Sequence, residues 1–182
     1  MSHLRLVPSP PPQVTPEEAC LEAFLRELDY VHRTLRRLGI APSETEDLAQ
    51  EVFLVLRKCW TAYDPGRPLR PYLFGIAFRI AAAHHRKRNR EVTFEMVEVS
   101  DVGPGPDDAL QTKRARALVL AALEQIPLPR RGVLLMHDLD EIPVEEVASA
   151  LGIPKFTVYS RLRKARREME TAVRRLTKAR IF

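Results

Sequence analysis

The sequence predicts an all-α protein of two small helical domains, which a flexible acidic linker joins. Apolar residues recur at steps of three and four over most of the 182 residues, as they do in amphipathic helices. Residues 91–108 hold six acids, no Lys or Arg and a Gly-Pro run, which is typical of a linker. Residues 143–167 have the pattern of a helix-turn-helix. We therefore expect domains at 17–90 and 109–178, after a disordered Pro-rich tail at 1–16.

The helix-turn-helix pattern is centred on a glycine between two helical segments. Gly152 suits the left-handed conformation of a helix C-cap, and Pro154 cannot continue the helix that ends there. A second helix is predicted to begin near Lys155. Its buried stripe should contain Val158, Leu162, Ala165, Met169, Val173 and Leu176. The second helix of such a pair lies in the DNA major groove, so a DNA reader is favoured over an ordinary helical hairpin.

Positive charge gathers in two parts of the chain. Residues 79–90 hold five Lys or Arg and no acid, and residues 155–180 hold ten against two Glu. These segments carry +5 and +8, so the rest of a chain with a net charge of +5 carries −8. Two basic segments on an otherwise acidic chain favour two nucleic-acid contacts over two solvated helix faces.

The predicted first domain begins with a helix from about Glu17 to Gly39. Its apolar side should contain Leu21, Phe24, Leu25, Leu28, Val31, Leu35 and Leu38. Ser43 and Glu46 fit a capping box that opens a second helix. The buried stripe of that helix should contain Leu48, Val52, Val55, Leu56 and Cys59. Phe53 falls beside the stripe, which predicts either a further core contact or a protein-docking face.

A third helix is predicted from about Pro71, with Leu73, Ile76, Ala77 and Ile80 inward. Aromatic residues at its start and a basic end suit single-stranded nucleic acid, because bases stack on rings and cations follow phosphates. His84 and His85 point about 100° apart on a helix, so they do not make a two-ligand metal face.

Other classes of function lack the residues they need. Cys20 and Cys59 are too few for a disulfide framework or a zinc site. No apolar run approaches the roughly 18 residues of a membrane span, and no signal-peptide apolar region is present near the start. We therefore expect a cytoplasmic protein that does not insert into membranes and uses no metal or cofactor.

In their order and spacing, these segments resemble a bacterial alternative sigma factor of the extracytoplasmic-function type, a two-domain initiation subunit of RNA polymerase. The resemblance covers residues 20–176. Residues 47–53 match the polymerase-docking helix of the family. Residues 72–77, followed by 86–88, match its promoter-melting and −10-reading helix. The −35-reading module is matched by residues 123–127, 152–154 and 157–162.

The resemblance implies a sigma factor, not an enzyme, that binds core RNA polymerase and directs sequence-specific promoter recognition and transcription initiation. It implies docking on the clamp helices of the largest polymerase subunit through Asp47, Gln50, Glu51 and Phe53. The opened −10 strand would contact Tyr72, Phe74, Arg79, Arg86 and Arg88. The −35 element would contact Lys155, Phe156, Thr157, Ser160, Arg161, Arg163, Lys164, Arg166 and Arg167. By analogy, an anti-sigma factor is a further partner, and the linker acids imitate RNA phosphates in the polymerase cleft unless the linker is a simple tether.

The chain departs from the family pattern in ways that bear on the promoter sequence. Tyr72 replaces a usual Trp, Phe78 and Arg79 replace Arg-Asn, and Ala83 replaces a common Asp. Phe156 stands where the family has a small glycine. Its ring predicts either a contact with a thymine methyl group or packing within the turn, on Leu151 or Ile153.

Two other classes of function compete with this interpretation. A stand-alone helix-turn-helix regulator explains residues 109–180 equally well, but it leaves the helix at 47–53 and the basic segment at 79–90 unexplained. A nuclease on a helical scaffold needs carboxylates clustered near a metal ion. The acids of this chain fall instead on a capping box and a linker.

Overall fold

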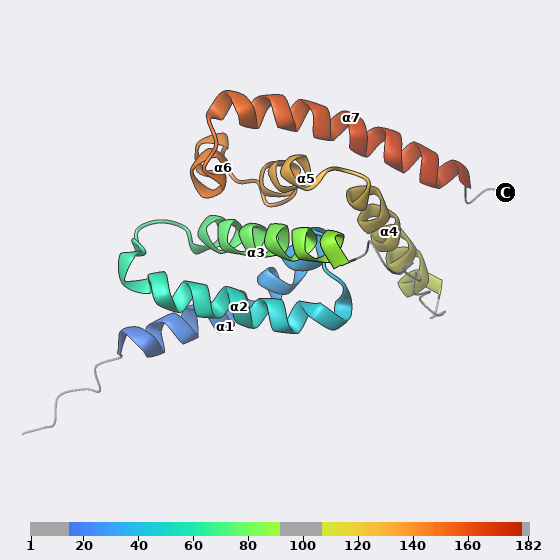
Figure 1. Cartoon of the computed structure of the whole chain (residues 1–182). Helices are drawn as coiled ribbons and strands as arrows, with labels where there is room; N and C mark the ends of the chain where they lie inside the picture. The colour runs from blue at the N-terminus through green and yellow to red at the C-terminus, as the bar shows by residue number, and fades with distance from the viewer. Residues whose placement is uncertain (1–14, 92–106, 180–182) are drawn as a thin grey trace, which may run out of the picture.

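The computed structural model describes residues 15–91 and 107–179, and these residues form helices and turns with no strand. The first domain consists of α1 (Pro16–Arg37), α2 (Pro42–Cys59), the short 3-10 helix η1 (Trp60–Ala62) and α3 (Leu69–Glu91). The second consists of α4 (Asp107–Glu124), α5 (Leu128–Leu134), the π-helical η2 (Leu135–Leu139), α6 (Val144–Leu151) and α7 (Lys155–Ala179). The predicted all-α fold with two helical domains is confirmed (Figure 1).

The helices reach further than the sequence pattern indicates. α3 continues to Glu91 and α4 begins at Asp107, so both extend into the segment predicted as a linker at 91–108. The stretch between them, 92–106, lies outside the described residues, as does most of the predicted Pro-rich tail.

The capping box predicted for α2 is wrong, and α1 has one that the sequence analysis missed. At the start of α1, the Thr15 hydroxyl accepts from the Glu18 N–H at 3.2 Å, and the Glu18 carboxylate accepts from the Thr15 N–H at 2.8 Å. α2 instead begins at Pro42 after Ala41, without a side-chain cap. Proline at a first helical position has the right φ and needs no partner for a missing N–H, so the helix starts one residue before Ser43.

The buried face of α1 differs in part from the predicted apolar side. Leu21 and Leu25 are exposed, whereas Cys20, Tyr30 and Thr34 are buried. α1 packs against α2 and α3 and also contacts α4. Several neighbouring helices therefore determine which residues of α1 are buried. In α2, Leu48, Val52 and Leu56 are buried as predicted, while Val55 and Cys59 are only half-buried.

α3 is the central helix of the molecule. Leu73, Ile76 and Ala77 are buried as predicted, but Phe74 and Gly75 on the other sides of the helix are buried too. Helices α1 and α2 cover one side of α3, and the segment from α5 to α6 covers the other (Figure 1). One hydrophobic cluster therefore runs through both domains. A helix that has neighbours on two sides buries apolar residues on both of them.

The helix-turn-helix prediction is confirmed in its geometry. Gly152 caps α6 in the left-handed conformation, with φ 63°, and the Ile153 N–H closes the turn on the Ala148 carbonyl at 3.0 Å. In α7, Val158, Leu162 and Ala165 are buried under the turn. Further along α7, Met169, Val173 and Leu176 are half-buried, and Ala172 is the buried residue.

Candidate nucleic-acid interface

One face of α2 stays open to solvent. Asp47, Gln50 and Glu51 are all exposed and point away from the core. Leu54 lies one helical turn after Gln50 and Glu51, on the same face of α2, and its side chain is 51% exposed. Phe53 makes the further core contact that was one of its two predicted roles, because it is half-buried with its ring centroid 5.1 Å from that of Phe24 in α1. The exposed apolar residue of this face is therefore Leu54. The sequence analysis placed Leu54 neither in the buried stripe of this helix nor among the polymerase-docking residues.

The start of α3 carries an aromatic row that ends at Tyr72. The Trp60 ring stacks on that of Tyr63, and the Tyr63 ring packs at a tilt against that of Tyr72. In each pair the two ring centroids are 5.3 Å apart. Tyr72 is half-buried, and desolvation together with the nearby Cys59 raises the pKa of its phenol, so it remains a neutral donor. Beside this row lies a hollow of about 250 Å³, which Arg67 and Arg79 line together with Glu146, Ser149 and Ala150 of α6.

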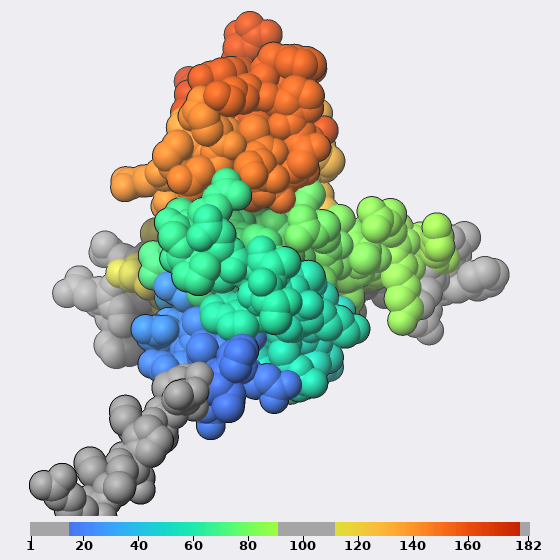
Figure 2. All heavy atoms as spheres, turned by 90° about the vertical axis from the view of Figure 1, so that its left-hand side faces the viewer, coloured from blue at the N-terminus to red at the C-terminus, as the bar shows by residue number. Residues whose placement is uncertain are grey.

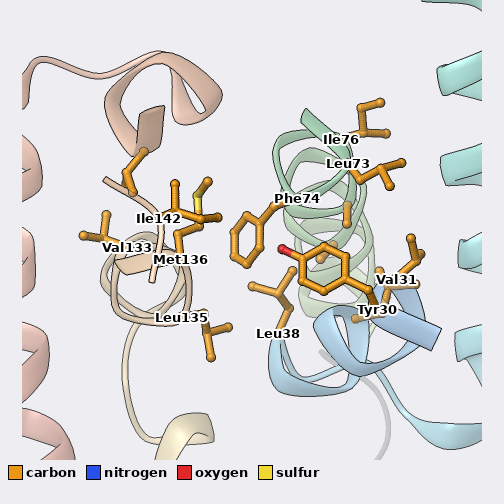
Figure 3. Packing of buried hydrophobic residues seen from close by; sticks show 14 of the residues in the cluster. Tyr30, Val31, Leu38, Leu73, Phe74, Ile76, Val133, Leu135, Met136 and Ile142 are labelled. Atoms are coloured by element: carbon orange, nitrogen blue, oxygen red, sulfur yellow. The ribbon is translucent and has the colours of Figure 1, made fainter. Parts of the chain in front are cut away.

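Phe74 does not lie on the accessible surface that its predicted role requires. Only 1% of it is exposed, and its ring points from α3 toward Met136 and Ile142 of the second domain (Figure 3). The predicted contact of Phe74 with the strand therefore stays a prediction that requires the two domains to separate. The physical reason is that α5, η2 and α6 supply a second apolar partner to α3, which no local pattern reveals.

The other cations predicted to contact the −10 strand are more open. Arg79 is exposed, and its Nη1 lies 3.4 Å from the Ala150 carbonyl oxygen of α6. Arg86 is exposed and Arg88 is half-buried at the end of α3, which projects from the side of the molecule (Figure 2). The basic end of α3 is thus available, whereas its aromatic start is covered.

Arg131 of α5 ties the two domains together and was not predicted. It is only 7% exposed, and all three of its nitrogens donate to backbone carbonyls. Nη1 donates to the Leu38 carbonyl oxygen, just after α1, at 2.8 Å. Nε donates to the carbonyl oxygen of Ile126, in the turn after α4, at 3.2 Å, and Nη2 donates to that of Glu124, the last residue of α4, at 2.9 Å. Burial lowers the pKa of this guanidinium, and the carbonyl dipoles of two helix ends compensate the buried charge.

A second polar contact across the domains involves Asp140, which follows η2. Its carboxylate accepts from the Tyr30 hydroxyl at 2.7 Å and from Arg37 Nη1 at 3.2 Å, both in α1. Burial raises the pKa of Asp140, and burial together with that carboxylate raises the pKa of Tyr30. The tyrosine therefore stays protonated and keeps donating to the carboxylate.

The exposed side of α7, opposite its buried stripe, forms a basic crest that differs in part from the predicted set of DNA contacts. Phe156, Ser160, Arg163 and Arg167 follow one another along the side opposite the buried stripe, and Lys164 is exposed beside them. The Phe156 ring is 74% exposed, which contradicts the alternative that it packs within the turn.

The remaining predicted contacts of α7 are partly covered or already paired. Thr157 and Arg161 are half-buried at the flank. Lys155 pairs with Glu145 at 2.9 Å, and Arg166 makes two bonds of 2.7 and 2.8 Å to Asp138. Each of these two cations is thus already paired with an acid of its own chain.

Two sigma-factor regions match this chain, one in each domain. Residues 23–91 match the family model described as Sigma-70 region 2, and residues 116–169 match Sigma-70, region 4. Together they account for the open face of α2, the aromatic and basic helix α3, and the helix-turn-helix with its basic crest. The chain belongs to the extracytoplasmic-function family of sigma-70-like factors.

Similar sigma factors come from several bacteria. SigE of Mycolicibacterium smegmatis is 27% identical over an alignment of 154 residues. The match covers 81% of this sigma factor and 59% of that protein, which is less than two thirds of its length. The RNA polymerase sigma-E factor of Streptomyces coelicolor is 29% identical over 138 residues, or 75% of this chain and 76% of that one.

Similarity to a solved structure extends over both domains. The sigma factor RpoE of Bartonella quintana, solved with the anti-sigma factor NepR, matches with a TM-score of 0.65 at 21% identity. That match covers 86% of this chain and 98% of the other, and it supports the fold. In the described residues of this sigma factor, no helix is long and apolar enough to cross a membrane, and no three His, Cys, Asp or Glu gather to hold a metal ion.

Proposed function

We propose that this sigma factor binds core RNA polymerase in the cytoplasm, directs it to specific promoters and initiates transcription, without catalysing a reaction itself. The observation that carries the proposal is the presence of both sigma regions in one chain, each with the surface its role needs. Region 2 contributes the open face of α2 and the basic end of α3, and region 4 contributes the basic crest of α7.

The polymerase-docking face is proposed to be Asp47, Gln50, Glu51 and Leu54, with Phe53 supporting it from the side. Three polar side chains around one exposed leucine suit a helix-on-helix contact such as the clamp helices of the largest subunit offer. An anti-sigma factor is a second proposed partner, because the similar RpoE structure contains one.

Promoter opening requires the domains to separate. In the closed arrangement Phe74 is buried under the second domain, and Tyr72 and Arg79 line a hollow whose other wall is α6. Opening a duplex costs about 1.4 kcal/mol for each stacked step, and a base captured on an aromatic ring regains about 1–3 kcal/mol. Exposing Phe74 would add a capture site, so we propose that polymerase binding draws the second domain off α3.

Run-off transcription tests the proposed function directly. The full chain is added to core polymerase on a library of promoter-length duplexes, and initiation should depend on its addition. A stand-alone helix-turn-helix regulator would bind some duplexes but would give core polymerase no new start sites. That result would replace the proposal with the competing function.

Leu54→Ala is expected to weaken core-polymerase binding by about 5- to 30-fold, because truncation of a central apolar contact costs roughly 1–2 kcal/mol. Its thermal stability should stay within a few degrees of the wild type, since the side chain is already half in solvent. Phe53→Ala is the matched control and should lose stability, since it removes the contact with Phe24. Polymerase affinity is measured by titration and stability by thermal unfolding; loss of affinity only in the Phe53 variant would contradict the assignment of Leu54.

The −35 contacts are proposed to divide into base and phosphate contacts. Arg161→Ala should relax base preference at one or two positions by roughly 1–3 kcal/mol, as expected for a bidentate contact. Lys164→Ala should weaken binding to every sequence and lower the slope of log affinity against log salt by about one unit. Binding of both variants across a duplex library at several salt concentrations checks this, and identical behaviour would refute the division.

A further inference from the structure

We infer that Phe156 and Tyr159 recognise thymine methyl groups in the −35 element, an inference that rests on the proposed function and names a specificity within it. Both aromatic rings stand in solvent, with Phe156 74% and Tyr159 58% exposed. They are three residues apart near the start of α7, so they are neighbours on one helix face. Neither ring belongs to the hydrophobic cluster that the described residues form.

The charge around the pair indicates DNA as its occupant. Residues 155–167 hold six Lys or Arg and no acid. Arg163 and Arg167 continue the same crest beyond the rings, at the spacing of successive helical turns. The first turns of a recognition helix are those that meet base edges in the major groove, while cations further along meet phosphates. An apolar pair followed on the same crest by the exposed cations Arg163 and Arg167 therefore fits a base edge flanked by phosphates.

The chemistry of the rings selects the base. In the major groove the only apolar group that a base presents is the C5 methyl of thymine, and the other edges present hydrogen-bond donors and acceptors. The phenylalanine ring offers no partner to those groups and would leave them desolvated and unpaired. Tyr159 combines a similar apolar ring with one hydroxyl that can donate or accept at an adjoining polar edge.

This recognition would depend on the side chain at position 156. With glycine at position 156 there would be no side chain to reach a methyl group. The Phe156 ring also contributes nothing to the core, so its removal should leave the fold intact. The pair is thus expected to shift the preferred −35 sequence toward thymine at one or two positions.

Replacement of thymine by deoxyuridine tests the inference, because it removes the methyl group and keeps the base pair. Duplexes are first selected by the wild-type holoenzyme from a library randomised over the −35 region, and each thymine is then replaced in turn. Wild-type binding should weaken about threefold to fivefold for each contacted methyl. Phe156→Gly should lose this sensitivity at one position and Tyr159→Ala at its neighbour, while Tyr159→Phe should retain it. Thr171→Ala, an exposed change four turns along α7, is the control and should behave as wild type.

Several outcomes would overturn the inference. Selected sites without thymine, equal wild-type affinity for thymine and deoxyuridine, or an undiminished deoxyuridine penalty in Phe156→Gly would each do so. If Phe156→Gly instead lowers transcription or polymerase affinity with unchanged DNA preference, the pair contacts protein. If it lowers the melting temperature by many degrees, the ring has a structural role. The proposed function fails separately, and only if the holoenzyme initiates on no member of the library.

Discussion

Arg131→Met is expected to lower the free energy of unfolding by about 2–4 kcal/mol. The wild-type guanidinium donates to the backbone carbonyls of Leu38, Glu124 and Ile126, and its bonds to Leu38 and Ile126 are buried. Methionine fills a similar volume but donates nothing, so buried carbonyls at the ends of two helices lose a donor. His85 Nε2 lies 2.9 Å from the same Leu38 oxygen and can compensate only there.

The neighbouring arginine provides the matched control for this prediction. Arg130 carries the same side chain but pairs at the surface with Glu168 at 2.7 Å, with each partner about one-third exposed. Arg130→Met should therefore cost no more than about 1 kcal/mol. Urea unfolding followed by circular dichroism measures both. Equal losses in the two variants would show that the buried network of Arg131 contributes no special stability.

Gly75→Ala is expected to separate the two domains while the first domain stays folded. A Cβ atom at this position would lie 2.7 Å from the Ala150 carbonyl oxygen of α6, a backbone atom that cannot turn aside. Within α3 itself the change is favourable by about 1 kcal/mol, because alanine is a better helix former than glycine. Overpacking of this kind costs about 1–3 kcal/mol, which shifts the ratio of closed to open molecules by roughly 5- to 150-fold.

Two measurements follow the separation. Small-angle scattering should give a larger radius of gyration, and a single-stranded −10 probe should bind more tightly as Phe74 becomes exposed. Thr177→Leu is the control, because it adds volume to an exposed position of α7, away from the contact between α3 and α6 and from the residues predicted to contact the −10 strand. It should leave both quantities unchanged. A Gly75→Ala protein that stays as compact as the wild type and binds the probe no better would contradict the closed arrangement as the barrier to strand capture.

Much of this sigma factor follows from local patterns of the sequence. Periodic apolar residues locate the helices, because in an amphipathic helix the spacing of the apolar residues marks the side that is buried. Gly152 marks the turn of the helix-turn-helix, since a left-handed C-cap is a property of a single residue. The acidic segment and the two basic segments also follow directly from composition, and with them the expectation of two helical domains and two nucleic-acid contacts.

The tertiary structure alone decided how these parts meet. Periodicity identifies a helix that has one partner, but α3 has partners on two sides, and the second comes from residues about sixty positions later. For that reason the burial of Phe74 was not predicted. The roles of Arg131 and Asp140 depend on carbonyls and side chains about 93 to 110 residues away. Likewise, the exposed apolar residue of α2 is Leu54 and not Phe53, because Phe24 of α1 packs against the Phe53 ring. Contacts at such separations are set by the packing of whole helices, and a local sequence pattern contains no record of them.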